Sequence, residues 1–154
     1  MKHAIAALLF LTIAMGCKPD DRTIKVHASD AEMNAAIARA RSTLDSFWAL
    51  YSSPRNGESD FALKVKITDP NGVEHFWCTQ LRRENGQIFG TINNDPDIVK
   101  SVKDGQEIAI KPDDISDWLY MRGGKMYGNF TVRPLFKSMT AEELKRMKEL
   151  LAEP

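Results

Sequence analysis

The spacing of apolar residues changes once along this chain, and the change separates a helical part from a part made of strands. Between residues 33 and 51 the apolar positions recur at helical spacing, and a Ser29-x-x-Glu32 capping box, with Ser29 or Asp30 as the first residue, indicates where the helix begins. From Phe61 onward the period becomes two, as in a half-buried strand. A helix must therefore pack against a sheet to bury both apolar faces.

Two tight turns join the first strands. The segments 61–68, 73–83 and 87–93 are separated by Asp69–Gly72 and by Glu84–Gly86, whose residues favour turns between antiparallel strands. The sequence therefore predicts a three-stranded meander. Its middle strand contains Phe, Trp and Cys in succession, which indicates apolar cover on both faces and a central place in the sheet.

Further elements follow the meander. Residues 95–102 are expected to form a short helix, and residues 106–111 alternate as a fourth strand. Gly123 and Gly124 predict a hairpin, and Gly128 in its second arm predicts a bulge or the close approach of another backbone. A capping box at Thr140 starts a closing helix with Leu144, Met147 and Leu151 on one face. We expect an α+β fold: an N-terminal amphipathic helix packed on an antiparallel sheet of five or six strands, a meander plus a hairpin, and a C-terminal helix.

Residues 1–16 have the pattern of an export signal. Lys2 precedes an apolar run from Ala4 to Met15, which is too short to span a bilayer. The run ends before Cys17, and this arrangement resembles the bacterial lipoprotein signal, in which the cysteine is lipidated and becomes the new N-terminus. The organisation we expect is a signal peptide at 1–16, a lipidated N-terminus with a flexible tether at 17–28 and a single α+β domain at 29–154.

The location of the protein follows from that resemblance. Lys18 stands where an Asp retains such lipoproteins in the inner membrane, so we expect an anchor in the outer membrane, facing the periplasm. The alternative is cleavage after Gly16 to give a soluble periplasmic protein. Cys78 would then be able to pair with Cys17, whereas with Cys17 lipidated Cys78 is a single buried thiol.

Charge and motifs restrict the functions that this chain can have. The 21 basic and 21 acidic side chains balance, which argues against nucleic acid as a partner. The sequence contains neither a phosphate-binding glycine loop nor a nucleophile elbow, and it has no metal-ligand spacing of His or Cys. We therefore expect no cofactor and no metal, and we assign no catalytic residue.

Six residues are the candidate site. Cys17 is the candidate lipidation site, and Trp118, Asp114, Asp117, Tyr127 and Asn94 are candidate ligand-binding residues. The acids either perform acid–base chemistry or hold a cation, or they belong to a capped turn. Trp118 is either a ligand platform or a core residue packed over the sheet with Trp77, and Tyr127 lies either in the core or at the edge of a binding surface.

Several motifs in combination resemble one family. They are a Trp-containing strand at 75–81, an NDP turn at 94–96, an alternating strand after Gly105, ISDW at 115–118 and GNFT at 128–131. Together they are similar to the YegJ-like family, domain of unknown function 2314, over residues 30–136. The resemblance implies one compact domain of uncharacterised role. It supplies no reaction and no catalytic residues.

These observations favour an uncharacterised envelope lipoprotein whose domain binds something without catalysis. We expect a monomer, anchored to the membrane by its lipid, with a protein or small-ligand partner. One alternative is a hydrolase that uses the acidic residues near Trp118. Another is an inhibitor or immunity-type protein that binds one protein partner.

Overall fold

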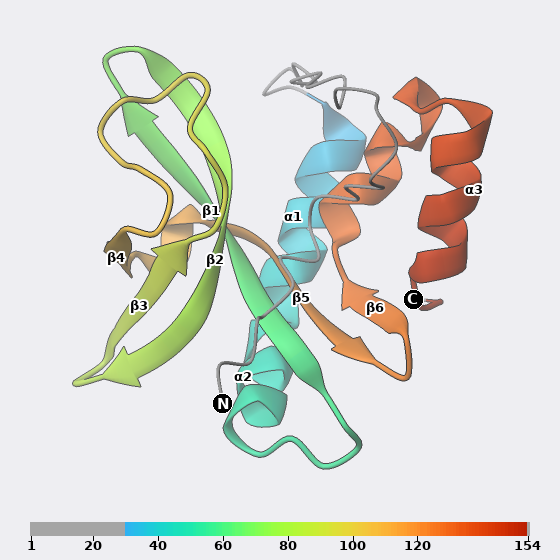
Figure 1. The fold of residues 1–154 in the computed structure, drawn as a ribbon, viewed down its shortest axis with the longest axis horizontal. Coiled ribbons are helices and arrows are strands. Elements are labelled where there is room, and N and C mark those ends of the chain that lie inside the picture. The colour runs from blue at the N-terminus through green and yellow to red at the C-terminus, as the bar shows by residue number, and fades with distance from the viewer. Residues whose placement is uncertain (1–29, 154) are drawn as a thin grey trace.

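The computed structural model describes residues 30–153 (Figure 1), so the expected signal peptide, Cys17 and the tether lie outside the described residues. The helical elements are α1 (Ala31–Ser42), α2 (Leu44–Ser52), the 3₁₀ segments η1 (Pro112–Asp114) and η2 (Phe130–Ser138), and α3 (Ala141–Leu150). The strands are β1 (Ser59–Asp69), β2 (Gly72–Glu84), β3 (Gln87–Ile92), β4 (Glu107–Ile110), β5 (Ile115–Arg122) and β6 (Lys125–Gly128). The α+β prediction is confirmed.

The six strands form one antiparallel sheet in the order β4-β3-β2-β1-β5-β6. The meander β1–β3 and the β5–β6 hairpin agree with the sequence prediction, and β2 lies inside the sheet as expected. The Asp69–Gly72 turn fixes the register of β1 against β2, which places Lys64 opposite Trp77 and Lys66 opposite His75. This register positions the side chains discussed below.

The N-terminal helix is not continuous, which corrects the prediction. Asp30 caps α1 by accepting hydrogen bonds from the amides of Glu32 and Met33 at 3.0 and 3.1 Å. The chain then breaks at Thr43, where φ is −109° and ψ is 6°. The Thr43 hydroxyl donates to the carbonyl oxygens of Arg39 and Ala40 in the preceding turn, and α2 begins at the next residue.

The sheet has two faces with different cover. The main-core face carries Leu63, Phe76 and Trp118, which pack with Phe47 of α2 and Ala40 of α1. The opposite face has a smaller apolar cluster under η2 and α3. It consists of Ala62, Leu119, Met121, Met126, Val132 and Leu151. Figure 1 shows η2 and α3 on the β5–β6 side of the molecule, away from β3 and β4.

Trp118 belongs to the main-core face and is 7% exposed. Its indole Nε1 donates to the carbonyl oxygen of Ala40 at 3.0 Å, which ties β5 to the end of α1. The expectation that Trp118 packs with Trp77 is wrong, because Leu63 pairs with Trp118 while its neighbour Lys64 pairs with Trp77. Neighbouring residues of a strand point to opposite faces, so the two indoles are on opposite sides of the sheet.

Gly128 makes the close approach that its position in the hairpin predicts. Its φ is +78°, and a Cβ there would lie 2.2 Å from the carbonyl oxygen of Trp118. A side chain at this position would therefore collide with backbone and with the indole ring. Only glycine lets the end of β6 lie directly on Trp118.

The helix expected over residues 95–102 does not form. The amides of Asp97, Ile98 and Val99 instead donate to the carboxylate of Glu74 at 2.9 to 3.2 Å. The amides of residues 100 and 101 donate in the same way to Asp69, at 2.6 and 3.0 Å. Two carboxylates from the β1–β2 hairpin thus replace the hydrogen bonds that a helix would supply.

Candidate functional site

The structure does not bring the sequence-predicted ligand residues together. Asp117 and Trp118 are neighbours on β5 but point to opposite faces, and Asp114 is half-buried at the end of η1. Tyr127 is half-buried on the main-core side, where its ring stacks on Tyr120 at 5.0 Å. Asn94 uses its side-chain oxygen to accept the amide of Trp77 at 3.0 Å, so it fastens the loop to β2.

Asp117 is fully buried, and both of its oxygens are engaged. One oxygen accepts the amide and the hydroxyl of Thr131 at 2.7 Å each, and the other accepts the amide of Trp118 at 2.9 Å. Burial raises the pKa of Asp117, and the Thr131 donors and Lys64 oppose that rise. The carboxylate therefore holds the start of η2 on the sheet, and no oxygen of it faces solvent.

Lys64 is a further member of this network. Its Nζ donates to the hydroxyl of Thr131 at 3.1 Å and lies 5.5 Å from the centre of the Trp77 ring. Burial lowers the pKa of Lys64, and the nearby Asp117 charge acts in the other direction. Lys64 is half-buried as a residue, and its ammonium lies in buried surroundings formed by Thr131, Trp77 and the nearby Asp117.

His75 lies beside Lys64 on the same face and is exposed as a residue, but its ring is turned inward. Its Nδ1 is 2.8 Å from the hydroxyl of Ser116, which donates to the carbonyl oxygen of Lys64 at 3.2 Å. A hydroxyl has one proton, so Nδ1 donates to Ser116 and Nε2 keeps its lone pair. Burial of the ring, followed by the positive charges of Lys64 and Lys66, lowers the pKa of His75 to about 4.

These groups do not make a nucleophile. Ser116 is 2% exposed, so a substrate has no access to its hydroxyl. Cys78 is buried on the main-core face, and that burial raises the pKa of its thiol to about 12. Within residues 30–153, no three His, Cys, Asp or Glu side chains gather closely enough to hold a metal ion. The arrangement is suited to holding elements together and to presenting a surface.

Among residues 30–153, no helix covers a large part of the opposite face, although Trp77 at its margin packs against the small cluster under η2 and α3. We call this part the open face, and it consists of the residues of β2, β3 and β4 that point away from the main core. None of them is buried, and they include Val73, His75, Trp77, Thr79, Arg82, Phe89, Thr91, Glu107 and Ala109. The main-core residues of the same strands, such as Ile88 and Ile110, are buried. The helices make their closest contacts with the sheet at β5 and β6.

Two aromatic rings mark the open face. Trp77 and Phe89 are both half-buried, and each has a cation over it. The guanidinium of Arg82 lies 4.1 Å from the Phe89 ring centre and also pairs with Glu107 at 2.9 Å. Sequence reasoning missed this surface. The two-residue turn at Asp69–Gly72 was the signal for it, because that turn alone fixes which β1 and β2 residues share a face.

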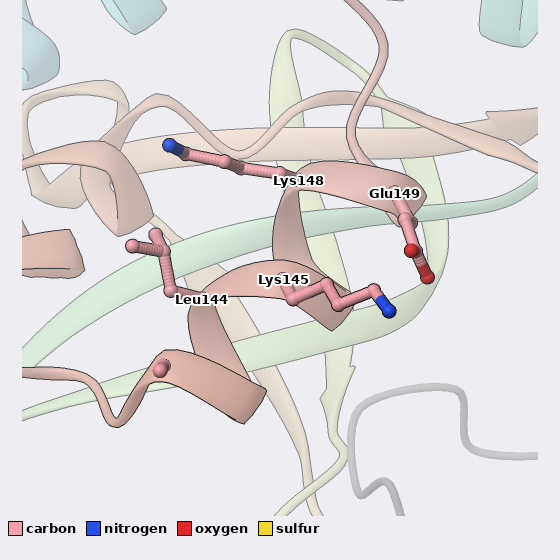
Figure 2. Close-up of a pocket in the computed structure, with 5 residues that line it drawn as sticks. Leu144, Lys145, Lys148 and Glu149 are labelled. Atoms are coloured by element: carbon pink, nitrogen blue, oxygen red, sulfur yellow. The ribbon is translucent and has the colours of Figure 1, made fainter.

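A shallow depression on the outer side of α3 is a second candidate (Figure 2). Ala141, Leu144, Lys145, Lys148 and Glu149 line it, and all five come from this single helix. Figure 2 shows Leu144 and Lys148 on one side and Lys145 and Glu149 on the other. Met147 and Leu150 pack against the small apolar cluster, Leu151 is buried in it, and Leu144 is half-buried and lines the depression. The capping box at Thr140 and Glu143 is confirmed.

No helix within residues 30–153 is long and apolar enough to cross a membrane. Comparison with known families gives one match: DUF2314, described as an uncharacterized protein conserved in bacteria, matches residues 30–151. The match includes α3 and thus extends past residue 136, where the resemblance found from the motifs ends. The family resemblance is confirmed.

Two curated relatives are similar to the chain. The uncharacterized protein YegJ of Escherichia coli (strain K12) is 39% identical over 145 residues, which are 94% of each protein. A putative ankyrin repeat protein of Neisseria meningitidis serogroup B is 35% identical over 127 residues, or 77% of this chain and 50% of that protein. No solved structure matches significantly.

Proposed function

The chain belongs to the DUF2314 family, and we propose that its domain is a non-catalytic module that binds another protein through the open face. The observation that carries this proposal is the uncovered side of β2, β3 and β4, where Trp77 and Phe89 keep part of their rings accessible. Aromatic residues and arginine are enriched at protein interfaces, and here both kinds stand on a rigid sheet.

The state of the candidate acids supports a binding role over a hydrolytic one. Both oxygens of Asp117 accept hydrogen bonds from Thr131 and Trp118, and Asp114 lies with Asp113 on a different element, η1. A hydrolase needs an acid or base within reach of substrate. These two residues instead serve the packing of η2 and the entry into β5.

The relative from Neisseria meningitidis adds support of another kind. It is named as a putative ankyrin repeat protein, and the region similar to this chain makes up half of it. Repeat arrays of that class present extended surfaces to other macromolecules. We carry a recognition role to this chain as part of the proposal, on the strength of that name.

Site-specific crosslinking in cells tests the binding role. A photoreactive residue at Ala109, on the open face, is expected to give one discrete protein adduct, and the same residue at Lys145, on α3, is expected to give none. The Phe89→Asp substitution should remove the adduct from position 109, because it places a charge at the centre of the surface. Identical products from both positions, or an adduct that persists with Phe89→Asp, would contradict the proposal.

We further propose that the protein is an outer-membrane lipoprotein with its lipid on Cys17. The support is the signal-like pattern of residues 1–16 and the Lys that follows the cysteine. Labelled palmitate should enter the wild type and Cys78→Ser, but not Cys17→Ser. Equal labelling of the two cysteine variants would refute lipidation, and an unlabelled wild type in the periplasmic fraction would favour the soluble alternative.

A further inference from the structure

The strand β4 is one edge of the sheet, far from α3 and β6 (Figure 1). Among the elements of residues 30–153, β3 is the one that packs extensively along it. The other edge, β6, is partly occupied, because Met126 forms a bridge with Leu151 and its carbonyl oxygen accepts the amide of Ala152 at 2.8 Å. Within the part of the chain that the structure describes, β4 is therefore the open edge, and such an edge is a template for a further strand.

The hydrogen-bonding groups of β4 alternate in direction. The amide of Ile92 donates to the carbonyl oxygen of Gln106 at 2.9 Å, and the register of β3 and β4 then continues without a shift. Residues that bond to the neighbouring strand alternate with residues that do not. The amides and carbonyls of Glu107 and Ala109 therefore point out of the sheet. The amide of Lys111 follows the same alternation, since its backbone is still extended, with φ −81° and ψ 136°.

The side chains of this edge are complementary to a second copy of themselves. The sequence from Glu107 to Lys111 is Glu-Ile-Ala-Ile-Lys. When two copies run antiparallel with Ala109 opposite its own counterpart, Glu107 stands opposite Lys111 at both ends. These three residues are exposed, and they alternate with Ile108 and Ile110, which then face each other on the main-core side. Opposite charges and apolar pairs both stabilise neighbouring strands.

The charges at the two ends of the edge are unbalanced within one copy. Arg82 pairs with both Glu84 and Glu107, so two carboxylates share one guanidinium and the group has a net charge of −1. Lys111 is exposed and forms no ion pair with another residue of the range 30–153. The antiparallel register brings the free Lys111 of one copy to the acidic group of the other. A register with Glu107 opposite its own counterpart would place like charges together instead.

We propose that the protein forms a two-fold symmetric dimer in which β4 pairs with β4 of a second copy. Both copies use the same segment, so the interface closes on itself and the two sheets become one. The paired stretch is short, because the chain turns into η1 at Pro112. We therefore expect a dimer that depends on concentration, as small interfaces do. This inference goes beyond the proposed function and differs from the monomer expected from the sequence.

The dimer also extends the open face. Phe89 is the register partner of Ala109, so the row from Phe89 to Ala109 continues into the second copy in reverse order. The two Phe89 positions are then three strand spacings apart, or about 14 Å. A protein bound to this surface would contact the same aromatic group twice.

Disulfide crosslinking of the full-length protein in cells tests the pairing and its register. Ala109→Cys places the new thiol opposite its counterpart, with Cα atoms about 5.5 Å apart, so a mild oxidant should give a disulfide dimer. Glu107→Cys lies on the same strand and face, but its two copies would be roughly 14 Å apart. It should give no more dimer than the wild type, which carries the same Cys17 and Cys78. No dimer from Ala109→Cys, or as much from Glu107→Cys, would overturn the proposal.

Charge reversal in the Ala109→Cys protein tests the ends of the interface. Glu107→Lys alone and Lys111→Glu alone each set like charges opposite one another, and each should slow formation of the disulfide dimer roughly fivefold or more. Coexpression of the two charge variants should restore it, because every pair across the interface is then of opposite charge. A variant that fails to fold cannot be rescued in this way. An unchanged rate in the single variants, or no recovery on coexpression, would overturn the proposal.

The photocrosslink at Ala109 separates this inference from the proposed function by the mass of the adduct. An adduct of twice the mass of the chain supports the dimer. An adduct with a different protein supports the binding role, and the Phe89→Asp comparison applies to that adduct. If Ala109→Cys gives no disulfide dimer while a different protein is crosslinked, the dimer falls and the binding role stands. If the second copy is the sole adduct, the dimer stands and the proposed function falls.

Discussion

The carboxylate of Asp117 in β5 accepts both the backbone amide and the hydroxyl of Thr131 in η2, each at 2.7 Å. One side chain therefore attaches the start of a 3₁₀ segment to an inner strand of the sheet. The pair also explains how a charged residue can be buried in this domain, since its hydrogen-bonding capacity is filled by neighbours.

Asp117→Ala is expected to destabilise the domain by about 3 kcal/mol, because it leaves the buried amide and hydroxyl of Thr131 without an acceptor. Asp114→Ala is the matched control and should change stability by less than about 0.5 kcal/mol. Urea unfolding of both variants measures the difference. An Asp117 variant that folds as stably as the wild type but abolishes a cellular phenotype would instead indicate a chemical role for the acid.

Gly128→Ala is expected to be much more damaging than Gly124→Ala. Both glycines have a positive φ, +78° and +76°, so each substitution carries a similar backbone cost of about 1 kcal/mol. At Gly128 the new Cβ also collides with Trp118, which adds roughly 1–3 kcal/mol, while nothing lies within 4 Å at Gly124. Equal unfolding midpoints for the two variants would contradict the close packing of β6 on Trp118.

The three tryptophans should differ in their access to a quencher. Trp48 and Trp118 are 5% and 7% exposed, and Trp77 is half-buried on the open face. Acrylamide should therefore quench the wild-type fluorescence in part, and Trp77→Phe should remove most of the quenchable fraction. Trp48→Phe, the control, should leave that fraction unchanged. Quenching that survives Trp77→Phe would mean that the open face is covered.

His75 is expected to titrate near pH 4, well below the ordinary value of 6.5. Its folded pKa is lowered, so the unfolded state takes up the proton first as pH falls. Stability should decrease as pH falls from 6.5 toward 4, and His75→Gln should remove that part of the decrease. Lys66→Gln should raise the pKa of His75, because one of the two nearby ammonium groups is gone. Titration by NMR measures both values, and a pKa of 6.5 in the wild type would contradict the described surroundings.

The elements that could be predicted from the sequence are those that neighbouring residues specify. The turn at Asp69–Gly72, the hairpin glycines and the Thr140 capping box each specify structure from neighbouring residues, and each is found. The break at Thr43 and the loop before β4 were not predicted. The amide of Asp97 finds its acceptor on Glu74, 23 residues earlier, and no local pattern contains that contact.

The candidate site illustrates the same limit. The period of two that begins at Phe61 implies that Lys64 and Lys66 point away from the core, but the sequence does not show how much of that face η2 and α3 cover. Asp117 and Trp118 looked like one cluster because they are adjacent in sequence, yet a strand sends them to opposite sides. To know which side chains lie together, one needs the register of the strands and the positions of the helices on the sheet. Composition and motifs supply neither.

The loop of residues 97–101 has a shape that is encoded elsewhere in the chain. Its consecutive amides are held by Glu74 and Asp69, and any residue other than proline supplies an amide. Hydrogen bonds from the amide of Lys100, then others, lower the pKa of Asp69 to about 2, so the clamp survives mild acid. The form of this loop therefore depends on two acids of a neighbouring hairpin, Glu74 and Asp69, which lie more than 20 residues earlier in the chain.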